Sequence, residues 1–274
     1  MNRMTPEDNQ EYLLGANKAE LARLQFQHEV WKTVTESFFD RLNVGTGWHC
    51  LDVGAGPGFV ASDLRDRVGE QGSVTILEPS KFYVETFRNT TKEHGWANVE
   101  CILGTAETME LPKETYDLIF VRWVVSFVPD LDRFFANLLA SLKPGGVIAF
   151  QDYYYEGLSL FPRGAFNSVA DIMRSYYRSN GGNAYVAAEI PGLFRRHNIK
   201  LKEFTPHSLS GGYDSDITEW AGRFFTMHLP IMVEKGFITK DQCDAILGDW
   251  NAQRMNPDMV FFSPIVVDVA GIKS

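Results

Sequence analysis

Two hydrophobic patterns alternate along residues 43–152. Short runs that are almost entirely apolar have the pattern of strands covered on both faces, and helix-length amphipathic segments separate them. The runs that predict strands cover 48–53, 74–77, 99–103, 116–121 and 147–150. The clearest helix spans 131–142, where apolar residues recur at helical spacing before a Lys-Pro-Gly-Gly sequence. Strands that alternate with helices predict a parallel sheet with right-handed crossovers.

The rest of the chain adds further elements to this core. One amphipathic helix is expected over 17–42, and the pattern becomes less regular after Asp152. The elements predicted there are helices at 165–179, 185–197, 217–235 and 239–254, and strands at 199–205 and 260–269. We therefore predict an α/β fold, with a Rossmann-like, mostly parallel seven-stranded sheet, helices on both faces and a helical cap.

The same patterns predict three parts in the chain. Residues 1–42 are expected to form an N-terminal helical cap segment, and 43–152 the Rossmann-like core. Residues 153–274 are expected to complete the sheet, with helical cap insertions at about 153–182 and 210–256.

Composition narrows the classes of function. The 274 residues carry a net charge of −9 and no cluster of Lys and Arg, which argues against non-specific contact with nucleic acid. The polar, acidic N-terminus does not resemble a signal peptide, and no apolar run approaches the roughly 20 residues of a membrane span. Three widely spaced cysteines without a CxxC pair predict neither a metal site nor disulfides. We expect a cytoplasmic protein without a metal and leave its oligomeric state open.

A glycine-rich turn follows the first predicted strand. The sequence GAGPG over 54–58 allows a sharp turn and close approach of a ligand, and the helix that begins behind it favours a carboxylate or phosphate. Glu78 ends the next strand, twenty residues after Gly58, where a carboxylate can accept hydrogen bonds from both hydroxyls of a ribose. Together these features predict a nucleoside-cofactor site at the carboxyl ends of the strands.

Five segments in order carry a resemblance to a known family. They read LDVGAGPG, ILEPS, LGTAETMELP, YDLIFVRWVVSFVPD and LKPGGVIAFQD. They resemble the motifs of class I S-adenosylmethionine (SAM) dependent methyltransferases, in particular the type 11 and ubiquinone/menaquinone-biosynthesis-like enzymes that act on small molecules. The resemblance covers about residues 47–152. It implies SAM as cofactor and transfer of its methyl group to a small molecule.

The resemblance also implies roles for residues of the glycine loop and the second strand. The loop residues expected to line the methionine part and the ribose are Gly54, Ala55, Gly56 and Gly58. Asp52 would anchor the loop or the amino end of the cofactor. Glu78 would hold the ribose hydroxyls, with Pro79 and Ser80 beside it.

Further cofactor contacts are implied on the following strands and the N-terminal helices. Thr105, Ala106 and Glu107 would border the adenine, although many relatives carry Asp where Thr105 stands. Arg122 and Trp123 would lie under the sulfonium and the methionine. The residues expected to close over the cofactor, unless they are surface positions of an amphipathic helix, are Tyr12, Arg23 and Gln27.

The chemistry of methyl transfer sets what the acceptor site needs. Displacement at a sulfonium requires alignment and exclusion of water, and a base only where the acceptor must lose a proton. His228 is the first candidate for such a base, with a packed histidine as the alternative. Tyr153, Tyr154, Phe224 and Phe225 are expected to line the acceptor pocket, and their aromatic character favours an apolar or aromatic acceptor.

Two other classes of protein stay open. A SAM-binding sensor or partner subunit without catalysis would keep the same loop and the same Glu78. A nicotinamide-dependent oxidoreductase would need G-x-G-x-x-G, whereas Phe59 follows Gly58 here, so it is the weaker alternative. Methylation of nucleic acid or protein is disfavoured by the acidic charge and the aromatic cap.

Overall fold

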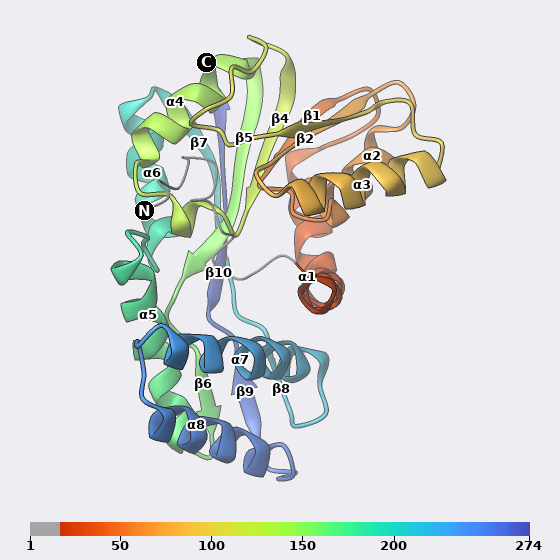
Figure 1. The fold of residues 1–274 in the computed structure, drawn as a ribbon. Helices are drawn as coiled ribbons and strands as arrows, with labels where there is room; N and C mark the ends of the chain where they lie inside the picture. Colours follow the sequence, from red (N-terminus) through yellow and green to blue (C-terminus); the bar gives the residue numbers. More distant parts are fainter. Residues whose placement is uncertain (1–16) are drawn as a thin grey trace, which may run out of the picture.

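A computed structural model describes residues 17–274 of the chain and contains a seven-stranded sheet in the order β3-β2-β1-β4-β5-β10-β7 (Figure 1). The strands of this sheet are β1 (His49–Val53), β2 (Ser73–Glu78), β3 (Val99–Leu103), β4 (Tyr116–Arg122), β5 (Leu142–Tyr154), β7 (Ile199–His207) and β10 (Ile265–Lys273). Neighbouring strands from β3 to β5 are parallel, and only β10 runs antiparallel to both its neighbours. The predicted Rossmann-like, mostly parallel sheet is confirmed.

Helices cover both faces of this sheet. The helices are α1 (Lys18–Leu42), α2 (Phe59–Val68), α3 (Lys81–Glu93), α4 (Leu131–Ser141), α5 (Val169–Ser179), α6 (Val186–Arg196), α7 (Asp216–Glu234) and α8 (Lys240–Gln253), with short 3-10 turns η2 (Val125–Phe127) and η3 (Ala165–Ser168). The second half of α1 packs with α2 and α3 on one face, where Phe38 and Leu64 join a buried cluster. Helices α4 and α6 cover the opposite face through Phe135 and Phe194. Side chains of the sheet therefore alternate between two cores.

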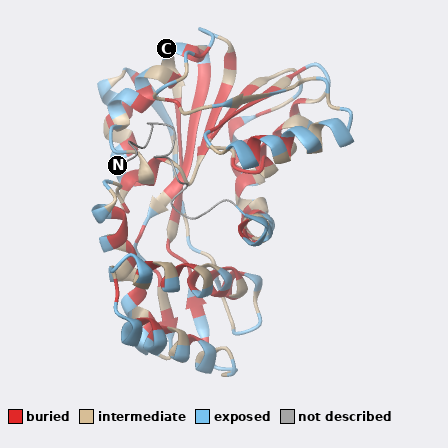
Figure 2. Cartoon of the chain, viewed as in Figure 1, coloured by how far each residue is buried: buried red, intermediate tan, exposed pale blue. Residues whose placement is uncertain are grey.

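A smaller antiparallel sheet with its own core lies beyond the carboxyl end of β5. Its strands are β6 (Ser159–Phe161), β9 (Val260–Phe262) and β8 (Ser210–Gly211), in the order β6-β9-β8. Helices α5, α7 and α8 pack against it around Phe166 and Phe261, and Figure 2 shows the buried side of these elements turned toward one another. The division of the chain into segments at 42, 152, 182, 210 and 256 stays a prediction.

The single strand expected at 260–269 is wrong. The chain forms β9 and β10 with a break between them, and the two strands pair in different sheets. Pro264 occupies the break and cannot donate a backbone hydrogen bond, so the ladder cannot continue through it. Ser263 stabilises the turn by donating from Oγ to the Pro264 carbonyl at 2.9 Å.

The structure of residues 17–274 bears on three expectations, which concern membrane spans, cysteines and metal sites. None of the helices in this range has an apolar stretch long enough to cross a bilayer. Cys50, Cys101 and Cys243 are free thiols. Within the same range, no group of three or more His, Cys, Asp and Glu side chains is arranged to hold a metal ion.

The glycine loop generates a stability prediction. Gly58, the N-cap of α2, has φ +81°, and a Cβ there would lie 2.2 Å from the Phe87 ring. Gly56 has φ +56° but open space around it. We expect Gly58→Ala to lower the free energy of unfolding by about 2–4 kcal/mol, from backbone strain plus overpacking, and Gly56→Ala by only about 1 kcal/mol.

Urea denaturation of both variants without added cofactor measures this difference. Equal destabilisation by the two substitutions would show that the Phe87 ring moves aside at no cost.

Candidate functional site

A cleft of about 1110 Å³ opens at the carboxyl ends of β1, β2 and β4, as expected for a sheet of this topology. Predicted cofactor residues from the first two strands that line it are Asp52, Gly54, Ala55, Gly56, Glu78, Pro79 and Ser80. Those from later parts of the chain are Thr105, Ala106, Glu107, Arg122 and Trp123, together with Gln27 from α1. The structure thus brings together residues that are up to about one hundred positions apart in sequence.

The glycine loop is held against the ends of β2 and β4. Gly54 has φ +66° and donates its N–H to the Leu77 carbonyl at 2.7 Å. A Cβ on Gly54 would come within 2.3 Å of a methyl group of Val124, so only glycine allows this approach. Gly58 does not line the cleft, because its position is filled by the Phe87 ring, and its predicted contact with the cofactor is corrected to a structural role.

Glu78 joins the glycine loop to the turn that follows β2. Its Oε2 accepts from the Gly56 N–H at 2.9 Å and its Oε1 from the Ser80 N–H at 2.8 Å. The side chain is 1% exposed, and burial raises its pKa while these two bonds oppose the rise. Each carboxylate oxygen can accept a further hydrogen bond, so the group can still receive two donors from a ligand.

Asp52 is buried beneath the glycine loop. Burial raises its pKa to about 7, an effect that nearby Arg122 opposes and nearby Glu78 reinforces. Its Oδ2 has no hydrogen-bond partner among the described residues. A buried acceptor without a donor is costly, and it indicates a place for a ligand donor such as an ammonium group.

Arg122 and Trp123 form the floor of the cleft where β4 ends. Burial lowers the pKa of Arg122 to about 10, with Asp52 acting in the opposite direction. Its guanidinium donates to Thr35 Oγ1 at 3.1 Å and lies 4.7 Å from the Trp123 ring. Trp123 adopts φ +54°, a strained conformation for a non-glycine residue, and stacks on Tyr153.

The far end of the cleft is lined by Thr105, Ala106 and Glu107. Thr105 Oγ1 is paired with Thr108 Oγ1 at 3.0 Å, and the Ala106 carbonyl accepts from Asn137 Nδ2 at 2.9 Å. Ala106 is therefore fixed by a side chain of α4, which holds its N–H in place on this wall.

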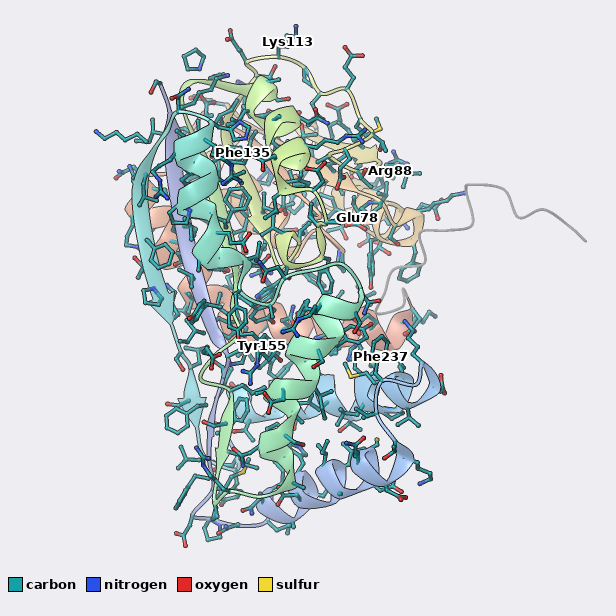
Figure 3. The ribbon with its side chains drawn as sticks, turned by 90° about the vertical axis from the view of Figure 1, so that its left-hand side faces the viewer. Glu78, Arg88, Lys113, Phe135, Tyr155 and Phe237 are labelled. Atoms are coloured by element: carbon teal, nitrogen blue, oxygen red, sulfur yellow. The ribbon has the colours of Figure 1, made fainter. Side chains whose placement is uncertain are left out.

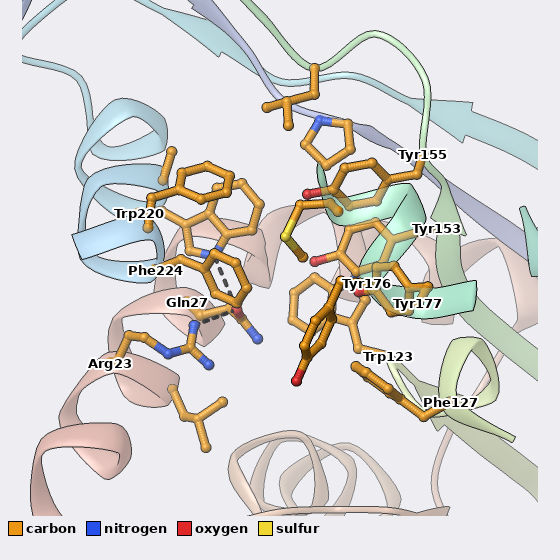
Figure 4. Close-up of a pocket in the computed structure, with 16 residues that line it drawn as sticks. Arg23, Gln27, Trp123, Phe127, Tyr153, Tyr155, Tyr176, Tyr177, Trp220 and Phe224 are labelled. Atoms are coloured by element: carbon orange, nitrogen blue, oxygen red, sulfur yellow. Dashed lines mark hydrogen bonds between the residues drawn. The ribbon is translucent and has the colours of Figure 1, made fainter. Parts of the chain in front are cut away.

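A second, aromatic cavity of about 70 Å³ lies between β5 and α7 (Figure 4). Tyr153, Phe224 and Phe225 line it, as predicted, together with Trp220 and Tyr155. Figure 3 shows Tyr155 at the level of α1, where the large sheet meets the cap helices, with Glu78 above it. Sequence analysis missed the contribution of α5, whose lining residues are Met173, Tyr176 and Tyr177 at helical spacing.

The two cavities share part of their walls. Leu24, Gln27, Trp123 and Phe127 line both. Helix α7 also reaches the larger cleft through a second set of residues that the sequence did not indicate, namely Met227, Ile231, Glu234 and Lys235. The two cavities are therefore neighbours in the structure.

Two predicted site residues lie elsewhere. Tyr154 points away from both cavities, is 37% exposed and packs on Tyr185, because alternate residues of β5 face opposite sides. Arg23 lines the aromatic cavity instead of the cofactor cleft. Tyr12 lies outside the described residues.

His228 does not line either cavity, so the prediction of a catalytic base is corrected. It is 2% exposed, and burial lowers its pKa to about 4, which keeps the ring neutral. Nδ1 lies 2.8 Å from the Phe224 carbonyl, and the ring stacks on Phe224 at 4.3 Å between centroids. The histidine supports a wall of the aromatic cavity from behind.

The burial of Asp52 predicts how the stability of the folded protein depends on pH. Its folded-state pKa of about 7 lies above the ordinary 3.8, so the folded protein retains a proton that the unfolded chain has lost between these values. Its contribution to stability is therefore present below pH 3.8 and falls as pH rises through 7. We expect Asp52→Asn to gain about 2–3 kcal/mol over wild type between pH 5 and pH 8.

Chemical denaturation of wild type and Asp52→Asn across this pH range checks the expectation. Asp66→Asn, at a surface position, is the control and should follow wild type at every pH. Parallel pH profiles for wild type and Asp52→Asn would contradict the assignment of a raised pKa to Asp52.

Part of the chain is similar to known methyltransferases. Residues 50–146 match the family model described as "Methyltransferase domain". A curated relative, the ubiquinone/menaquinone biosynthesis C-methyltransferase UbiE of Psychromonas ingrahamii, is 30% identical over 138 residues, which are 49% of this chain and 54% of that protein. The chain thus spans about half the length of this relative.

Solved structures share the fold at low sequence identity. Geranyl diphosphate methyltransferase has a TM-score of 0.56 and 16% identity, covering 90% of this chain and 80% of that one. The [4+2]-cyclase SpnF has a TM-score of 0.57 and 16% identity, covering 88% of this chain and 80% of that one. The two names denote different reactions, so these structures show a shared fold and not a shared activity. Residues 50–146 thus match a methyltransferase domain in the part of the chain that carries the glycine loop and strands β1 to β4.

Proposed function

We propose that this chain is a SAM-dependent methyltransferase that transfers a methyl group to a small-molecule acceptor by in-line displacement. The observation that carries the proposal is that two neighbouring cavities of different chemistry share lining residues. One is lined by the glycine loop and Glu78, the other by aromatic side chains, and Gln27 and Trp123 belong to both. A donor and an acceptor bound in them would lie next to each other, on either side of these shared residues.

The residues of the cleft fit the cofactor. Glu78 keeps an acceptor site on each carboxylate oxygen, which suits the two hydroxyls of a ribose. The unpartnered Oδ2 of Asp52 suits the ammonium of the methionine part. The close approach of Gly54 to Val124 leaves backbone, rather than a side chain, facing the ligand. Ala106 and Thr105 would border the adenine, as the family resemblance implies.

The chain's own residues supply binding, orientation and exclusion of water. When bound, SAM supplies a methyl group on a sulfonium whose departure leaves a neutral thioether. Arg122 and Trp123 would fix the floor on which the methionine part lies, since both are held by contacts to α1 and β5. The aromatic walls would keep water away from the transferred methyl group and hold the acceptor in line.

The side chains that line the aromatic cavity determine whether the protein could take a proton from the acceptor. Its described lining residues include no Asp, Glu, His or Lys. Burial raises the pKa of Tyr153 and of Tyr155, which makes both phenols poor bases near neutral pH. We infer that the acceptor reacts through an atom that needs no protein base, or loses its proton to water.

The class of acceptor and the cellular location are further parts of the proposal. An apolar or aromatic small molecule is the acceptor we favour, because the cavity is lined mainly by aromatic rings. A nucleic-acid acceptor is disfavoured by the net charge of −9. We keep a cytoplasmic location as a proposal. A SAM-binding protein without transfer activity is separated from an enzyme by turnover of SAM to S-adenosylhomocysteine with a pool of acceptors.

Substitution of Glu78 tests the cofactor site. We expect Glu78→Gln to weaken binding of S-adenosylhomocysteine about 10- to 100-fold, because a neutral amide replaces a charged acceptor that is worth about 1.5–3 kcal/mol. Calorimetric titration measures the change. Glu100→Gln makes the same substitution on β3, outside the cleft, and should bind like wild type.

The same titrations include NAD(H). Unchanged affinity of Glu78→Gln for S-adenosylhomocysteine would refute the ribose role. Binding of NAD(H) alone to wild type would refute SAM as the cofactor.

A further inference from the structure

Gln27 is a buried amide at the place where the two cavities meet. Its Oε1 accepts two hydrogen bonds, from Arg23 Nη1 at 2.9 Å and from Trp220 Nε1 at 3.0 Å (Figure 4). One donor comes from the preceding turn of α1 and the other from α7, so the amide is clamped between the two helices. Sequence reasoning assigned Gln27 to the cofactor, but these contacts indicate a different task.

The two donors decide which way the amide faces. Arg and the indole of Trp can only donate, so a reversed amide would set its own N–H groups against theirs. Nε2 must therefore point away from Arg23 and Trp220, and Figure 4 shows it directed into the cavity. Within residues 17–274, no hydrogen-bond partner of this nitrogen is found. The chain thus presents a pre-oriented donor to whatever occupies the junction.

The charge around this donor is balanced. Arg23 donates from Nε and Nη2 to the two carboxylate oxygens of Glu20, at 2.8 and 2.7 Å, and both side chains are almost fully buried. Since Glu20 compensates the guanidinium, the Gln27 amide stands in a region with little net charge. A neutral oxygen can accept from it without the cost of burying an unpaired carboxylate.

Aromatic rings surround the same point on two sides. Tyr153 comes from β5, Tyr155 follows the end of that strand, and Phe224 and Trp220 come from α7 (Figure 4). The aromatic cavity of about 70 Å³ is smaller than the ~150 Å³ that accepts a benzene ring. Only one edge of a planar ring enters it as the side chains stand, and the remainder must extend past Gln27 into the larger cleft.

We propose that Gln27 orients the acceptor by donating from Nε2 to a neutral carbonyl-type oxygen on a planar aromatic molecule. This inference rests on the proposed methyltransferase function and adds to it the class of acceptor and the residue that recognises it. The hydrogen bond would set the rotation of the ring in its plane. The atom to be methylated then faces the cofactor cleft while the aromatic walls hold the ring flat.

The variant that tests this is Gln27→Glu. A carboxylate at this position still accepts from Arg23 and Trp220, so the clamp between α1 and α7 is kept, while the donor toward the cavity becomes an acceptor. Gln25→Glu is the matched control, because Gln25 lies on the exposed face of the same helix. Circular dichroism and thermal unfolding establish that each variant is folded.

The probes are 1-indanone, a planar ring with one carbonyl oxygen, and indane, which lacks that oxygen. Ligand-observed NMR titrations measure their dissociation constants with and without saturating S-adenosylhomocysteine. We expect wild type and Gln25→Glu to bind 1-indanone about 10-fold more tightly than indane, the value of one hydrogen bond. In Gln27→Glu this preference should disappear.

Each other outcome overturns the inference. If the preference for 1-indanone survives in Gln27→Glu, or is absent from wild type, then Gln27 does not bind the acceptor through a carbonyl oxygen. If Gln27→Glu loses affinity for S-adenosylhomocysteine but keeps the preference for 1-indanone, then Gln27 binds the cofactor and not the acceptor. Failure of wild type to bind S-adenosylhomocysteine refutes the proposed function instead, and the titrations without it still decide the role of Gln27.

Discussion

The packing of helix α1 across the ends of β4 and β5 is the constraint on which both cavities depend. Trp31 of this helix is fully buried, with its ring edge-on to Trp123 at 5.9 Å and to Trp220 at 5.7 Å between centroids. One side chain thus contacts the end of β4 and the cap helix α7 together. Thr35, one turn further on, donates to Gln151 of β5 at 2.8 Å and accepts from Arg122. Apolar burial supplies the stability here, and the hydrogen bonds fix the position of the helix.

The cofactor cleft and the aromatic cavity are formed by different parts of the chain. The cofactor cleft is built around the glycine loop at the carboxyl ends of parallel strands, with the Glu78 carboxylate holding the loop in place. Such a site is preorganised because its groups belong to the sheet. The aromatic cavity is made mainly of side chains from α1, α5, α7 and the end of β5, and α5 and α7 lie outside residues 50–146, which match the methyltransferase domain. A fold of this kind can keep one cofactor site and change its acceptor by changing the cap.

The parts of the site that could be predicted are those encoded locally. Glycines in a turn, a carboxylate at the next strand end and their spacing lie within about thirty residues of sequence, and the parallel sheet brings strand ends to one edge wherever the order holds. Tyr154 and His228 were predicted wrongly because their neighbours in sequence line the cavity while they do not. One position along a strand reverses the direction of a side chain, and one position along a helix turns it by about 100°.

The sequence by itself determined the alternation of strands and helices over 43–152, the glycine loop, the pairing of that loop with Glu78 and the aromatic character of the cap. These depend on hydrophobic periodicity and on backbone conformations that few residues allow. Only the tertiary structure decided that Gln27 lines the aromatic cavity, that Arg23 is paired with Glu20 and that Gly58 is closed off by Phe87. The donor on Trp220 that fixes the Gln27 amide is 193 residues away in the chain. No local pattern carries such a contact, because it exists only when two helices pack together.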